Sequence, residues 1–69
     1  MASEIGGFEV LHFAASAAHA RAAHYRDQAS RLREMAEDEA IGRLRQRLIE
    51  TAIEYDNLAA NVLSRLSRN

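Results

Sequence analysis

The chain has 69 residues, of which nine are basic and ten acidic, so its formal net charge of -1 creates no overall field that would attract nucleic acid or anionic lipid. It contains no Cys, which excludes disulfides and thiolate metal sites. No window approaches the ~20 apolar residues of a membrane span, and no basic segment followed by an apolar run marks a secretory signal. We therefore expect a single small domain in the cytoplasm, with no cofactor and no membrane partner.

The N-terminal third predicts a long helix that starts after a short tail. Gly6 and Gly7 together cost a helix about 2 kcal/mol relative to alanine, so we expect residues 1–7 to be a flexible N-terminus and residues 8–69 to form the domain. The first helix is predicted from about residue 8 to about residue 39. Apolar residues recur along it at steps of three and four, the spacing of an amphipathic helix: Leu11, Ala15, Ala18, Ala22, Tyr25, Ala29, Leu32 and Ala36.

The segment 37–42 interrupts this apolar row and is the predicted turn. Its three acids, Glu37, Asp38 and Glu39, suit the positive start of a helix better than a negative end, which places the chain reversal here. The second helix is predicted from about residue 42 to about residue 67. It carries a second apolar row: Leu48, Ala52, Tyr55, Ala59, Val62 and Leu66. The predicted fold class is therefore all-α, an antiparallel two-helix hairpin.

Two registers of the hairpin are compatible with these rows. A short loop before Gly42 places Tyr25 beside Tyr55, whereas a tighter turn capped by Asp38 opposes Tyr25 to Ala52. Loops between antiparallel helices usually take two to five residues, which favours the first register. On the exposed side, acid-first pairs four residues apart are expected to form ion pairs: Asp27 with Arg31, and Glu39 with Arg43.

The residues on both sides of the turn also follow a recognisable pattern. It reads Tyr25-x6-Leu32-Arg33-x-Met35-Ala36, then Leu44-Arg45-x2-Leu48-x3-Ala52-x2-Tyr55-x2-Leu58-Ala59. Over roughly residues 25–60 this resembles a group of short, mostly uncharacterised helical-hairpin proteins of alphaproteobacteria. Members of that group often have Asn-Pro or Asp-Pro where this chain has Ile41-Gly42, which implies that the second helix starts there. The resemblance implies a hairpin fold and brings no catalytic or ligand-binding residue with it.

The polar residues offer no convincing reaction chemistry. Glu9 and His12 have the Glu-x-x-His spacing of di-iron bundles, but on a helix both lie away from the apolar row. His12 and His19 share a face at ~10.5 Å, too far apart for one ion, and His19 and His24 point about 140° apart. No serine has a His and acid arrangement, and there is no Gly-rich phosphate loop. We expect no enzyme and no metal site, and whether histidines meet across an interface stays open.

A hairpin of this size is expected to associate with itself. Even a compact fold of this length barely offsets its ordering entropy, and a rod of two helices buries less. A homodimer forming a four-helix bundle is the simplest solution, and higher even states stay open. Apolar residues outside the main row are the candidate interface: Ile49, Ile53, Leu58 and Leu63.

Arginines near the turn form a candidate polar patch, Arg43, Arg45 and Arg47, for an acidic partner or phosphates. Interleaved acids nearly cancel their charge, which favours an ion-paired, solvated end: Glu34, Glu37, Asp38, Glu39 and Glu50. The functional hypothesis is therefore a non-enzymatic structural or adaptor module that binds proteins, itself or another, through helix faces. The alternative is a dimeric hairpin that binds structured RNA through these arginines, by analogy of fold alone.

Overall fold

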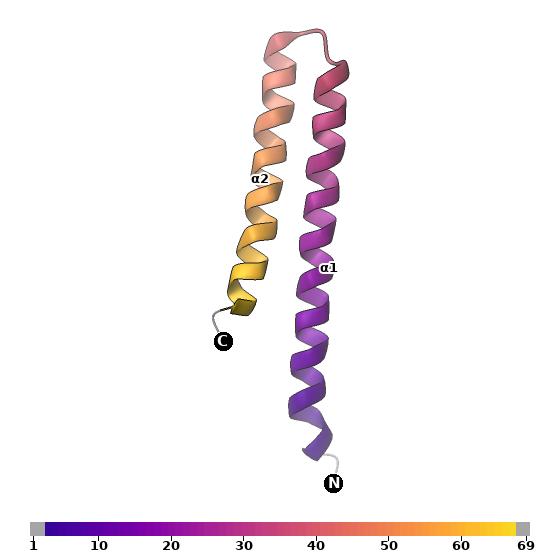
Figure 1. Ribbon diagram of the computed structural model, residues 1–69, viewed down its shortest axis with the longest axis vertical. Helices are drawn as coiled ribbons and strands as arrows, with labels where there is room; N and C mark the ends of the chain where they lie inside the picture. Colours follow the sequence, from indigo (N-terminus) through magenta and orange to yellow (C-terminus); the bar gives the residue numbers. More distant parts are fainter. Residues whose placement is uncertain (1–2, 68–69) are drawn as a thin grey trace.

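The computed structural model describes the backbone of residues 3–67 and the side chains of residues 12–67. Within this range the protein consists of two α-helices, α1 (Ser3–Asp38) and α2 (Gly42–Ser67), joined by residues 39–41. The helices run antiparallel and side by side (Figure 1). The predicted all-α helical hairpin is therefore confirmed.

The start of α1 differs from the prediction. Helix α1 begins at Ser3 and includes Gly6 and Gly7, so the predicted start near residue 8 is wrong, while Met1 and Ala2 lie outside the described residues. Extending an existing helix adds one backbone hydrogen bond for each residue that is ordered, and this lets the Ala-rich helix continue through two glycines.

The turn lies where the sequence predicts it. The backbone N–H of Arg45 donates to the carbonyl oxygen of Ile41 at 2.9 Å, which makes Ile41 the N-cap of α2. Ile41 has no side-chain oxygen to offer, but its own N–H donates to Oε1 of Glu39 at 3.0 Å. Glu39 thus stabilises the start of α2. Among the described side chains it does not form the predicted ion pair with Arg43.

The core between the helices is made of alanine. Of the described hydrophobic side chains, the buried ones are Ala18, Ala22, Ala29, Ala36, Ala52 and Ala59. All six belong to the two predicted apolar rows, so the inward faces of both helices are confirmed. The larger residues of the rows are only half-buried: Tyr25, Leu32, Leu48, Tyr55, Val62 and Leu66. The hairpin therefore encloses a narrow strip of small side chains, which allows a close approach of the two backbones.

Two contacts between the helices define how they align. The rings of Tyr25 and Tyr55 lie 6.1 Å apart between centroids at an interplanar angle of 33°, within the range of interacting aromatic pairs. This is the contact expected from the favoured register. Further toward the turn, Arg33 of α1 forms an ion pair with Asp56 of α2.

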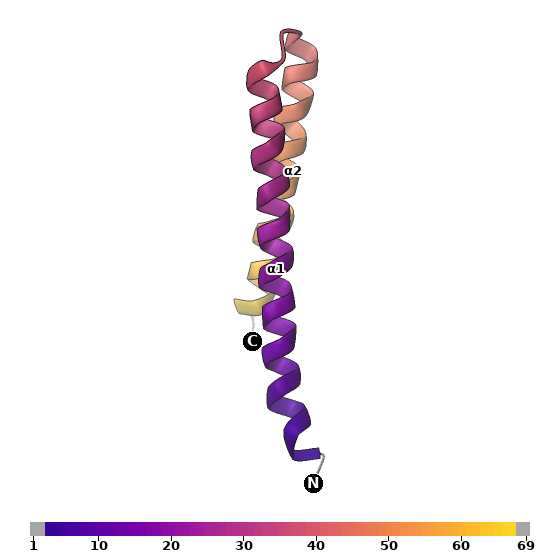
Figure 2. The same ribbon diagram turned by 90° about the vertical axis from the view of Figure 1, so that its right-hand side faces the viewer.

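The hairpin is a single layer of two helices. Its principal extents are 62 × 19 × 10 Å, and its radius of gyration of 17.2 Å exceeds the ~11 Å expected for a compact domain of this length. Viewed edge-on in Figure 2, α1 and α2 overlap. No third element of the described chain covers either broad face of the hairpin.

Candidate interaction surfaces

Several large apolar side chains of residues 12–67 lie outside the alanine core. Those most exposed are Phe13, Met35, Ile41, Leu44, Ile53 and Leu58. A single exposed apolar residue is normal on a protein surface, so what matters is whether these residues share a face.

The four residues predicted as an interface divide between two flanks of α2. Ile49, Ile53 and Leu63 fall within an arc of about 80° on the helix, whereas Leu58 lies about 140° from Ile53, on the other flank. Ile53 is 48% exposed, and Ile49 and Leu63 are half-buried. We call Ile49, Ile53 and Leu63 the isoleucine stripe. Leu58 therefore does not lie on the same surface as the other three residues of the predicted interface.

An open groove lies at the turn end of the isoleucine stripe. It has a volume of about 530 Å³ and is lined by Arg33, Ala36, Glu37, Arg45 and Ile49. Both helices contribute to it, with Ala36 as its small buried residue. On this face of the hairpin, each helix therefore contributes both an apolar and a charged side chain to the groove.

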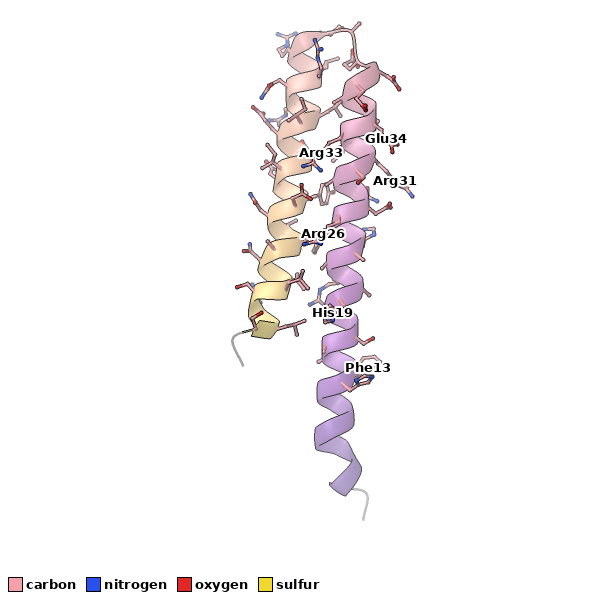
Figure 3. The ribbon with its side chains drawn as sticks, viewed as in Figure 1. Phe13, His19, Arg26, Arg31, Arg33 and Glu34 are labelled. Atoms are coloured by element: carbon pink, nitrogen blue, oxygen red, sulfur yellow. The ribbon has the colours of Figure 1, made fainter. Side chains whose placement is uncertain are left out.

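A row of basic residues runs along α1 on the same face. In Figure 3, Arg33, Arg26 and His19 lie on the side of α1 that faces α2. They are spaced seven residues apart, so they recur every ~10.5 Å along the helix, and His12 continues the series. We call these four residues the basic row. The seven-residue spacing of these four residues is visible in the sequence and is the signal by which the row could be predicted.

The basic row is only partly neutralised within the chain. Arg33 pairs with Asp56, and the two side chains remain 48% and 38% exposed. Arg26 has no ion-pair partner among the described side chains. Because an exposed ion pair contributes only ~0–1 kcal/mol, the Arg33–Asp56 contact aligns the helices more than it stabilises them.

The histidines are all exposed. The Nδ1 atom of His19 donates to the carbonyl oxygen of Ala15 at 2.8 Å. Within residues 12–67 no group of three His, Asp or Glu side chains could hold a metal ion, and the side chain of Glu9 lies outside that range.

The arginines near the turn do not form one patch. Arg43 and Arg47 share a face of α2, whereas Arg45 points about 160° away from Arg43. All three are exposed, and none takes part in an ion pair with another described side chain. The predicted ion-paired end is therefore not formed. The predicted helical pair of Asp27 with Arg31 is present, at 3.0 Å.

Comparisons of the chain with protein-family models, with curated proteins and with solved structures find no match. Over the residues that the structure describes, neither helix combines the length and the apolar character that crossing a bilayer requires. The class of protein is thus defined by the fold itself, a short all-α hairpin with an alanine core and open faces.

Proposed function

We propose that this hairpin is a non-enzymatic protein–protein interaction module, which acts through its helix faces and pairs with a second copy to form a four-helix bundle. The observation that carries the proposal is that the buried side chains are small, whereas large apolar side chains are exposed. Among residues 12–67 only alanines are buried, while larger apolar side chains such as Ile53 and Leu58 remain 48% and 43% exposed. Helix faces of this kind are completed by packing against other helices.

The exposed area supports the same proposal. The hairpin exposes 5650 Å², whereas a compact monomer of 7.7 kDa is expected to expose about 4,300 Å². The excess is about 1,300 Å² per chain, and a standard protein interface needs ~800 Å² from each partner. One further hairpin is therefore sufficient to bring the exposed area close to that of an ordinary domain. The absence of Cys suits a reducing compartment such as the cytoplasm.

The isoleucine stripe is the surface on which we place the contact. It lies beside the helix–helix boundary, so a second hairpin laid across that face would cover it together with the groove at Ile49. Leu58 lies on the other flank and would be available to a second, heterologous partner.

The test is to place a charge on the stripe and to measure the mass of the assembly. Ile53→Asp should convert a dimer into a monomer at micromolar concentration, because an unpaired carboxylate is costly to bury. Asn61→Asp is the matched control, since it adds the same charge on an exposed part of α2 about 80° away. Light scattering coupled to size exclusion would show the difference. If Ile53→Asp associates as strongly as the wild type, the stripe is not the interface.

A second candidate function, binding of structured RNA, is favoured by one observation. Arg43 and Arg47 are exposed on one face and have no ion-pair partner among the described residues, so they are available to phosphates. The net charge of -1 argues for the protein-binding proposal, and the next arginine on that face, Arg65, lies five turns or about 27 Å further along α2.

A further inference from the structure

The hairpin has a second broad face, opposite the isoleucine stripe. Successive residues of a helix are about 100° apart, so in two antiparallel helices that pack through alanines the residue before each alanine points to one broad face and the residue after it to the other. Ile53 follows the buried Ala52, on the face of the isoleucine stripe. Met35 and Leu58 each precede a buried alanine and therefore lie on the opposite face.

The centre of this second face is uncharged. We call it the tyrosine face, and its members come from both helices: Tyr25, Gln28, Leu32, Met35, Leu44, Leu48, Thr51, Tyr55 and Leu58. Met35, Leu44 and Leu58 are 56%, 46% and 43% exposed. The hydroxyl of Thr51 donates to the carbonyl oxygen of Arg47 at 2.9 Å, so it needs no partner from outside the helix. Leu44 and Leu58 are about 21 Å apart along α2, which is the length of about four helical turns.

Arginines without nearby acids lie at the end of the tyrosine face away from the turn. Beside its uncharged centre the outer edges carry two arginines and two acids, in balance: Arg31, Arg47, Asp38 and Glu54. Arg21 and Arg65 lie seven residues beyond Gln28 and Leu58, and no acid occurs within four residues of either arginine along the chain. Neither forms an ion pair with another described side chain. Both are therefore available to carboxylates of a partner.

The exposed area favours a narrow occupant of this face. The area exceeds that of a compact monomer by about 1,300 Å² per chain, and a second hairpin on the isoleucine stripe covers ~800 Å² of it. About 500 Å² remains, which is less than a further copy of the chain needs from each partner. A single helix, laid between α1 and α2, fits that area.

We infer that the tyrosine face binds one amphipathic helix of a different protein, along the line from Leu44 to Leu58. The end of that helix beyond Leu58 is acidic and pairs with Arg21 and Arg65. The inference rests on the proposed function and deepens it, since the isoleucine stripe takes a second copy and the tyrosine face takes the heterologous partner. Leu44 and Arg65 are about 31 Å apart along α2, so the bound helix has about 21 residues. A hollow of about 210 Å³ on this face accepts one of its side chains, and it is lined by Thr51, Glu54, Tyr55 and Leu58.

A synthetic peptide of about 21 residues tests the binding. It carries leucine at the first and fourth positions of each heptad and glutamates in its first turn, where they also stabilise its helix. Anisotropy of a fluorescent label on the peptide should show micromolar binding to the wild-type chain. Leu58→Asp should weaken that binding by at least about tenfold, because it places a charge in an apolar contact. Asn57→Asp is the matched control, because it adds the same charge at an exposed residue about 100° away and should change little. Equal effects of the two substitutions would overturn the inference.

A second pair of variants tests the acidic end of the bound helix. Arg21→Glu should weaken peptide binding by at least about fivefold, because it replaces an attraction with a repulsion. Arg26→Glu makes the same change in the basic row, on the face of the isoleucine stripe, and should leave peptide binding nearly unchanged. Equal losses in the two variants would show that the acidic end does not lie over Arg21.

The mass of the assembly separates this inference from the proposed function. Leu58→Asp should keep the mass of the dimer, and a monomeric mass would show that a second copy covers the tyrosine face. A wild-type dimer that fails to bind the peptide would overturn the inference and leave the proposed function standing. A wild-type monomer that binds the peptide would overturn the proposed self-pairing and leave the inferred helix site standing.

Discussion

Ala59 is a position at which the hairpin has no space for a larger side chain. It is 0% exposed and lies on the face of α2 that packs against α1. Ala59→Leu adds three carbon atoms between two closely packed backbones, and overpacking of this kind costs ~1–3 kcal/mol. Leucine is nearly as good a helix former as alanine, so the loss of stability would report packing and not helix propensity.

The assay is a thermal melt followed by far-ultraviolet circular dichroism. For a domain of this size, 1 kcal/mol corresponds to about 4–8 °C in Tm, so Ala59→Leu should lower Tm by at least about 4 °C. Wild type and variant must be compared at the same protein concentration, because self-association makes Tm depend on concentration.

Ala20→Leu is the matched control for this prediction. Ala20 is exposed on α1, so the same three carbons meet solvent there and the change in stability should stay within about 0.5 kcal/mol. Equal shifts of Tm for the two variants would refute the close packing of the alanine core.

Three further predictions follow from the turn, the cross-helix ion pair and the arginine face. Gly42→Ala should stabilise the protein by about 0.4–1 kcal/mol in the same melt, because Gly42 has no positive φ and an added Cβ would meet only one arginine side-chain nitrogen, at 3.9 Å. Asp56→Asn should cost less than ~1 kcal/mol at low salt and almost nothing at high salt, since the contact with Arg33 is exposed, and a large salt-independent loss would contradict this. Reversing Arg43 and Arg47 to Glu should leave self-association and protein capture intact; salt-sensitive loss of capture would instead favour the RNA-binding alternative.

The inward faces could be predicted because they depend on periodicity alone. Steps of three and four place Ala22, Ala29 and Ala52 on one side of their helices whatever surrounds them. The contact of Tyr25 with Tyr55 could be predicted because the loop is short, which leaves few registers.

The spacing of apolar residues carries no information about the local details, which depend on the balance between alternative interactions. The carboxylate of Glu39 could pair with Arg43 four residues ahead or accept a hydrogen bond from the N–H of Ile41 two residues ahead. In the loop of this hairpin it accepts from Ile41. The start of α1 at Ser3 followed from helix propagation, which outweighed the glycines. The position of Leu58 on a different flank from Ile49 could be predicted from their angular positions on an ideal helix. Comparing each residue with the apolar row alone does not reveal it.

The measurement that tests the central claim most directly is the mass of the wild-type chain in solution, combined with its thermal melt. Sedimentation equilibrium at micromolar concentration should give twice the 7.7 kDa of the chain, with a Tm that rises with protein concentration. A fully helical protein that sediments at 7.7 kDa and melts cooperatively at a concentration-independent Tm would contradict the account.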